Sequence, residues 1–117
     1  CLEGWTALAA LAAETSRLRI GLMVTGNTYR HPAVLAHIVA TLDVISGGRV
    51  DLGIGAGGNE YEHASNGIPL YAPGERIRRL DEACALMKSL FTEPVTDFDG
   101  RYYQLKEARL EPKPVHK

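Results

Sequence analysis

The sequence predicts an α/β fold, part of a (β/α)8 barrel. Arg17–Thr25 and the core of Gly47–Gly58 each have the alternation of a strand, and a helix opened by Pro32 lies between them. Strand, helix and strand within about forty residues form a βαβ unit, which implies parallel strands and a right-handed crossover. The second strand indicates a barrel: one of its sides is aliphatic, and the other holds Gly53 and Gly55.

The bare side of this second strand predicts where a ligand binds. In a (β/α)8 barrel, the aliphatic side of a strand meets the surrounding helices, and the other side faces the barrel axis. Gly53 and Gly55 would then lie near the carboxyl end of their strand, where barrel enzymes place their sites. Glycine at these positions would let a flat ligand lie against the backbone. By the same argument, Met23 and Thr25 on the first strand are expected to face the axis.

Three helices are expected, each with one apolar stripe. They span Leu2–Ser16, Pro32 to Ser46, and Gly74–Phe91, and Gly47 is expected to end the second in a left-handed conformation. Their predicted buried residues are Trp5, Leu8, Ala9 and Ala12 in the first helix, Leu35, Ile38, Val39, Leu42 and Ile45 in the second, and Ile77, Leu80, Cys84, Met87 and Phe91 in the third.

Two further segments complete the chain. Asn59–Pro73 is a polar loop, long enough to be functional, with room for only a short helical turn over Asn59–Ser65. Thr96–Gln104 is expected to form a hairpin that turns at Asp99-Gly100. Such a hairpin would be an insertion on the barrel and not one of its parallel strands.

Composition narrows the class of protein. The chain has 117 residues, of which 45% are hydrophobic and 23% are charged, so it can bury a core. Its formal net charge of −1 argues against a nucleic-acid partner. No apolar run approaches the ~18 residues of a membrane span, and Cys1–Ala13 does not resemble a signal peptide, so a cytoplasmic location is expected. Cys1 and Cys84 predict neither a disulfide framework nor a metal cluster. Residues 1–117 are interpreted as an internal segment of a single larger domain.

A rival interpretation rests on the same glycines. Gly53, Gly55 and Gly58 fit the G-x-G-x-x-G fingerprint of dinucleotide-binding folds. That fingerprint requires a helix opening at the third glycine and an acidic residue about twenty positions further on, at the end of the next strand. Neither requirement is met well, because Glu75, the carboxylate in that range, begins a helix.

Several polar residues have both a functional and a structural interpretation. Asn59 could bind a cofactor or its own loop backbone. His31 could cap a helix, line the site or lie on the surface, and the structural role is favoured. His63, with Glu60 and Glu62, would make a poor metal site, so no metal is predicted. Arg19 and Asp51, on the inward sides of adjacent strands, are expected to form a structural ion pair.

Five segments carry a family resemblance through their order and spacing: Trp5–Ala12, Val24–Pro32, Leu42–Arg49, Gly53–Gly57 and Phe98–Tyr103. Together they resemble the bacterial-luciferase-like superfamily, especially its coenzyme F420-dependent and flavin-dependent oxidoreductases. The resemblance implies that the chain forms the third and fourth βα units of a (β/α)8 barrel, with a flanking helix and hairpin. It also implies that the acid/base histidine and the cofactor phosphate site belong to other parts of the barrel, so no catalytic residue is assigned here.

The same resemblance implies the contacts of the cofactor ring. It places the ring against the end of the third barrel strand and the glycine-rich end of the fourth, where the corresponding residues here are Leu22, Met23, Thr25, Gly55, Ala56, Gly57 and Asn59. Relatives carry a non-proline cis peptide bond at the end of the third strand, which implies one at Leu22–Met23 here.

Two functional hypotheses follow from these observations. The first is a segment of an oxidoreductase or monooxygenase that uses reduced F420, the preferred cofactor, or FMN on a small organic substrate, with homo-oligomerisation left open. The second is a non-catalytic half-barrel that acts only after assembly with other chains. An oxidoreductase segment alone is expected to be inactive.

Overall fold

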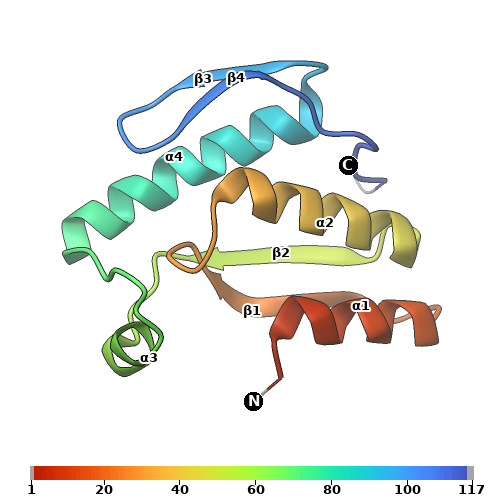
Figure 1. Cartoon of the computed structure of the whole chain (residues 1–117). Helices are drawn as coiled ribbons and strands as arrows, with labels where there is room; N and C mark the ends of the chain where they lie inside the picture. Colours follow the sequence, from red (N-terminus) through yellow and green to blue (C-terminus); the bar gives the residue numbers. More distant parts are fainter. Residues whose placement is uncertain (1, 116–117) are drawn as a thin grey trace.

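The computed structural model describes residues 2–115 and forms two small sheets and a set of helices (Figure 1). The elements in chain order are α1 (Gly4–Glu14), β1 (Ile20–Gly26), α2 (Pro32–Ser46), β2 (Val50–Gly55), α3 (Glu60–Ser65), α4 (Pro73–Thr92), β3 (Thr96–Asp99) and β4 (Gln104–Ala108). Every predicted helix and strand is present, including the short helical turn after the glycines.

The predicted βαβ unit is confirmed. β1 and β2 pair in parallel, with Ile20 beside Val50 and Gly26 beside Gly55 at the two ends of the ladder. α1 packs against β1 and α2, α2 packs against β2, and α4 lies beyond α2, so the helices follow one another around the strand pair (Figure 1). This is the arrangement of consecutive βα units in a partial (β/α)8 barrel.

The helix ends follow the signals in the sequence. His31 caps α2 by accepting a hydrogen bond from the Ala33 backbone N–H at 3.2 Å, and Pro32 occupies the first turn of that helix. Gly47 ends α2 with φ of 69°, as expected. The predicted structural role of His31 is therefore confirmed.

The buried faces of α2 and α4 match the prediction in part, since Leu35, Val39, Leu42 and Met87 are buried as expected. Ile45 and Ile77 are 51% and 63% exposed, and Cys84 is also exposed. Other residues, several of them small, are buried as well: Ala36, Ala40, Asp43 and Ser46 on α2, and Ala83, Leu86 and Leu90 on α4. Because α2 and α4 contact each other, alanine on their facing sides allows the helix backbones to approach closely. The predicted stripe of α1 is confirmed, since Trp5, Leu8 and Ala12 are buried.

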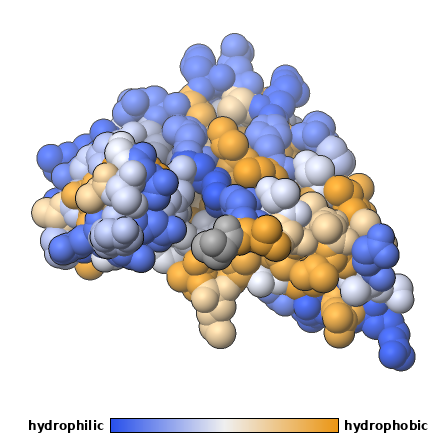
Figure 2. Space-filling view, turned by 60° about the horizontal axis from the view of Figure 1, so that its bottom comes forward, coloured by the Kyte–Doolittle hydropathy of each residue, from blue (hydrophilic) through white to orange (hydrophobic). Residues whose placement is uncertain are grey.

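Much of the remaining apolar surface lies uncovered among the described residues. Leu11 on α1 and Met23 and Val24 on β1 are each more than half exposed. Apolar side chains gather on the side of the molecule toward α1, whereas the end that carries α3 is largely hydrophilic (Figure 2). Within residues 2–115, β1 and β2 have no other strand beside them, so each has an unpaired edge of the kind that favours association.

The predicted hairpin is confirmed, and a side chain of α4 holds its turn. β3 and β4 pair antiparallel across α4, with the turn after Asp99 (Figure 1). The Glu82 carboxylate accepts hydrogen bonds from the backbone N–H groups of Arg101 and Tyr102, each at 2.9 Å, and of Tyr103 at 3.3 Å. One carboxylate therefore satisfies three consecutive donors that the turn leaves unpaired.

Replacing Glu82 by alanine is expected to lower the free energy of unfolding by about 2 kcal/mol, because backbone donors of a half-buried turn lose their acceptor. Denaturant melts of the protein that contains this chain measure the change. Asp81→Ala, at the exposed neighbouring position of α4, is the matched control and should change stability little. Equal losses in the two variants would contradict a role for Glu82 in holding the turn.

Candidate functional site

The carboxyl ends of β1 and β2 lie side by side and define the candidate site. The backbone N–H of Asn27 donates to the carbonyl oxygen of Gly55 at 2.8 Å, which joins the two strand ends. The predicted site residues of β1 therefore adjoin the glycines that end β2; they are Leu22, Met23 and Thr25. Ala56 and Gly57 continue directly from these glycines.

A bulge in β1 changes which residues point to each side. Leu22 pairs with Leu52 and Thr25 pairs with Ile54, so Met23 and Val24 stand opposite the single residue Gly53. An extra residue in one strand reverses the alternation beyond it. A non-proline cis peptide bond lies at Met23–Val24. The prediction of a cis bond at Leu22–Met23 is therefore wrong by one residue, although a cis bond does occur at the end of this strand.

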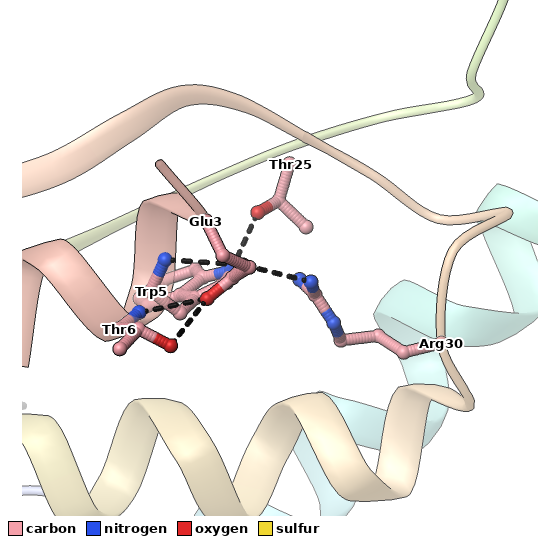
Figure 3. Close-up of polar contacts among 5 residues, drawn as sticks. All are labelled: Glu3, Trp5, Thr6, Thr25 and Arg30. Carbon is pink, nitrogen blue, oxygen red and sulfur yellow. Dashed lines mark hydrogen bonds and ion pairs between the residues drawn. The ribbon is translucent and has the colours of Figure 1, made fainter. Parts of the chain in front are cut away.

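The bulge turns Thr25 toward the helices. Its side chain is buried, and the indole Nε1–H of Trp5 donates to Thr25 Oγ1 at 2.7 Å (Figure 3). The prediction that Thr25 faces the axis is therefore wrong. Val24 takes that side instead, since its methyl groups lie 3.2 Å and 2.9 Å from the positions that a Cβ at Gly53 and at Gly55 would occupy.

The result is an open face of the strand pair, formed by Met23, Val24, Gly53 and Gly55. Met23 is 98% exposed and Val24 is 56% exposed. A Cβ at Gly53 would overlap the carbonyl oxygen of Leu22, and a Cβ at Gly55 would lie 2.9 Å from a Val24 methyl. The open face therefore presents backbone and two apolar side chains, as the bare side of β2 predicts.

The loop after β2 is fixed by local hydrogen bonds. Asn59 caps α3, its Oδ1 accepting from the Glu62 backbone N–H at 3.1 Å, which is the structural alternative for this residue. His63 is 1% exposed, and its Nδ1 lies 2.6 Å from the carbonyl oxygen of Asn59. Its Nε2 lies 2.7 Å from Thr28 Oγ1, so His63 ties the loops that follow β1 and β2 together. No motif or periodicity in the sequence indicates this contact.

Thr28 in turn sets the position of Gly57. Gly57 has φ of 82°, and a Cβ there would lie 2.6 Å from Thr28 Oγ1. Both features require glycine. Cofactor contacts by Ala56, Gly57 and Asn59 stay predictions.

The predicted ion pair lies at the other end of the strands. Arg19 Nε donates to Asp51 Oδ2 at 2.8 Å, and Arg19 Nη2 contacts Asp51 Oδ1. The pairing is confirmed, but the two side chains are 49% and 61% exposed, so the pair is not buried among the described residues. Because the pair lies far from the carboxyl ends of the strands, its role is structural.

Glu3 links the start of α1 to the loop after β1. Its carboxylate accepts hydrogen bonds from the backbone N–H groups of Trp5 at 3.2 Å and Thr6 at 2.8 Å, which caps the helix. Arg30 Nη2 lies 3.1 Å from Glu3 Oε1 (Figure 3). The hydrogen bond from the Thr6 backbone, with contributions from the Thr6 hydroxyl, Trp5 and Arg30, lowers the pKa of Glu3.

Acid is expected to weaken this link. A carboxyl whose pKa is lowered on folding adds stability above its unfolded pKa, near 4.5 for Glu3, and that stability is lost as the pH falls through the lower folded value. Denaturant melts at a series of pH values measure this. Between about pH 6 and about pH 3, the free energy of unfolding should fall less steeply for Glu3→Gln than for the unmodified protein. Glu14→Gln, exposed on the same helix, is the control. Identical pH profiles for all three proteins would contradict the assignment.

Two parallel strands with helices packed outside them are consecutive units of a (β/α)8-barrel protein, and the open glycine face lies at the carboxyl ends of these strands. The family model of luciferase-like monooxygenases matches residues 1–117, and the chain belongs to this family. The dinucleotide-binding alternative is wrong, because the helix after the glycines begins at Glu60 and has only 6 residues.

Relatives and solved structures agree with this family. The chain is 41% identical over 105 residues to an F420-dependent glucose-6-phosphate dehydrogenase of Kineococcus radiotolerans, covering 89% of this chain and 31% of the relative. An F420-dependent secondary alcohol dehydrogenase in complex with an F420-acetone adduct matches with a TM-score of 0.89 and 27% identity, over 99% of this chain and 36% of that structure. The monooxygenase RslO1 from Streptomyces bottropensis matches with a TM-score of 0.87 and 29% identity, over 98% and 34%.

The chain spans between 31% and 39% of the length of the curated relatives that it matches. In the described part of the chain, no helix is long and apolar enough to cross a membrane. The same residues contain no cluster of three His, Cys, Asp or Glu side chains arranged to hold a metal ion.

Proposed function

We propose that the chain forms one wall of the ring-binding site of an oxidoreductase that uses reduced F420 or FMN on a small organic substrate. The observation that supports this most directly is the open face, where glycine leaves backbone uncovered beside Met23 and Val24. A planar ring can lie flat only where no side chain stands between it and the strand.

The proposal gives each site residue a role. The backbone of Leu22, Met23 and Gly55 would support the ring. Val24, which the structure places on the open face, would also contact it, and Ala56 and Gly57 would lie along one side of the ring. Asn59 would contact it from the rim. Thr25 would act mainly through its backbone, because its hydroxyl accepts the Trp5 hydrogen bond. The bound cofactor would supply hydride or activate oxygen, and this chain would orient the ring and exclude water from one of its faces.

F420 is the preferred cofactor. The support for this choice is that relatives 37–41% identical to this chain are named F420-dependent glucose-6-phosphate dehydrogenases. FMN is the alternative cofactor. The proposed substrate is a small organic molecule, and no nucleic-acid or membrane partner is proposed. A cytoplasmic location and a homo-oligomeric assembly belong to the same proposal.

Titration of the protein that contains this chain with F420 and with FMN, followed by absorbance, tests the proposal. Gly55→Val would place side-chain atoms on the open face and is expected to weaken ring binding at least tenfold. Ala64→Val, on the exposed side of α3, is the control for an added branched side chain. Unchanged ring affinity in Gly55→Val would contradict the proposed position.

The 117-residue chain alone is expected to show no turnover with either reduced cofactor, because two parallel strands supply only part of a barrel mouth. Steady-state assays with reduced F420 and reduced FMN measure this. Turnover by the isolated chain would show that the described residues already contain the complete catalytic apparatus.

A further inference from the structure

His63 is a buried titratable side chain to which the proposed ring site assigns no contact. It is 1% exposed, whereas the other side chains of α3 are all exposed. A helix of 6 residues is not stable by itself in water, so its position depends on what it contacts. The buried contact of α3 is therefore made by an imidazole and not by an apolar side chain.

Both nitrogens of the His63 ring are engaged, which assigns their protons. Nδ1 lies 2.6 Å from the carbonyl oxygen of Asn59, and a carbonyl oxygen can only accept, so Nδ1 carries the hydrogen. In the neutral ring, Nε2 is then an acceptor, and the Thr28 hydroxyl, 2.7 Å away, is its donor. The hydroxyl of Thr28 is therefore held in one direction, with its proton toward His63.

The same hydroxyl oxygen lies against the α-carbon of Gly57. A Cβ at Gly57 would be 2.6 Å from Thr28 Oγ1 and 3.0 Å from Thr28 Cγ2. Arg76 Nη1 binds the carbonyl oxygen of Gly57. Gly57 is thus held at its α-carbon by Thr28 and at its carbonyl by Arg76, in a left-handed conformation with φ of 82°. Because Gly57 comes two residues after Gly55, its position sets how the backbone leaves the open face.

A second contact joins the loop after β1 to α3. The Tyr29 hydroxyl donates to Glu62 Oε2 at 2.7 Å, and the Tyr29 ring lies 4.7 Å from the His63 ring, measured between centroids. This contact and the one between Thr28 and His63 tie the same two segments together. The atoms nearest to a Cβ at Gly57, however, all belong to Thr28. The two contacts can therefore be tested separately.

We propose that His63 is a positioning residue for the ring site: it fixes the side chain of Thr28, which in turn holds Gly57 beside the ring. The inference rests on the proposed function and extends it to a residue that does not itself touch the ring. Residues that contact a ligand keep their geometry when hydrogen bonds from residues behind them lock them in place. Glycine has the greatest backbone freedom of any residue, so a glycine in a ligand site needs such support most.

Titration of the protein that contains this chain with F420 and with FMN, followed by absorbance, measures the effect. Thr28→Val keeps the branched shape and removes the hydroxyl, and His63→Phe keeps an aromatic ring and removes both nitrogens. Each is expected to weaken ring binding about tenfold. The double variant should bind no more weakly than His63→Phe alone, because both changes break the same hydrogen bond. Thr28→Ser keeps the hydroxyl and should keep the affinity of the unmodified protein.

Tyr29→Phe is the matched control, because it removes the hydrogen bond to Glu62 and leaves Thr28 in place. Its ring affinity should stay within about twofold of that of the unmodified protein. Amide hydrogen exchange of residues 56–59 in the cofactor-free protein gives a readout that needs no ring. Exchange should be faster in Thr28→Val and His63→Phe than in Thr28→Ser and Tyr29→Phe. If His63→Phe does not fold, Thr28→Val and Thr28→Ser decide the test.

The proposal is overturned if Thr28→Val and His63→Phe bind the ring as the unmodified protein does, even where their exchange is faster, because the contact would then order the loop without serving the ring. It is also overturned if Tyr29→Phe loses as much affinity as they do, or if the losses add in the double variant. Failure of the proposed function looks different: the unmodified protein would then bind neither F420 nor FMN, and both proposals would be wrong.

Discussion

Replacing Gly53 by alanine is expected to lower the free energy of unfolding by about 3 kcal/mol and to weaken cofactor binding. The bulge in β1 sets the carbonyl oxygen of Leu22 where the new Cβ would lie, and a Val24 methyl is 3.2 Å from the same position. Backbone cannot rotate away as a flexible side chain can. The added methyl must therefore displace the Leu22–Val24 segment, which forms part of the open face.

Denaturant melts and F420 or FMN titrations of the protein that contains this chain measure both effects. Gly74→Ala is the matched control, because a Cβ there meets only the end of the Arg78 side chain at 3.4 Å. The control should bind cofactor normally and unfold at unchanged or slightly higher denaturant. A Gly53→Ala protein as stable as the control would show that β1 moves freely at the bulge.

The strand pair could be predicted from the sequence because its alternation is regular. Val50, Leu52 and Ile54 mark one side of β2 without interruption, and the structure keeps that alternation. The same regularity in β1 led to the error at Thr25, since Leu22 and Val24 continue an unbroken apolar alternation. A bulge changes the side on which residues lie without changing their order, so it leaves no periodic signal.

The helix faces show a second limit. The sizes of Ile45, Ile77 and Cys84 suggested burial, but a helix that packs against another helix can bury its small residues instead. Contacts between distant loops, such as Thr28 with His63, depend on how the strand ends meet in space. A small cavity lined by Asn27, Arg76 and Tyr103 depends on the fold in the same way, because these residues come from a loop, a helix and the hairpin.

Arg49 joins three chain segments at the opposite end of the strand pair. Its Nη2 donates to the carbonyl oxygens of Ala12 at 2.9 Å and Thr15 at 2.8 Å, which end α1. Its Nη1 donates to the carbonyl oxygen of Leu18 at 2.7 Å, just before β1. Its Nε donates to the carbonyl oxygen of Ser46 at 2.6 Å, at the end of α2. One half-buried guanidinium thus satisfies carbonyl groups that a helix end leaves unpaired.

Arg49→Ala is therefore expected to lower the free energy of unfolding by about 3 kcal/mol, since several carbonyl oxygens lose a charged donor at once. Arg49→Lys should lose an intermediate amount, because an ammonium keeps the charge but cannot match the planar fork of donors. Urea melts of the protein that contains this chain measure both variants, with Arg17→Ala at a nearby exposed position as the control. If Arg49→Lys is as stable as the unmodified protein, positive charge alone holds these ends together and the geometry of the guanidinium is unimportant. If Arg49→Ala matches Arg17→Ala, the contacts add nothing to stability, and α1, β1 and α2 must be held at this end by their apolar packing.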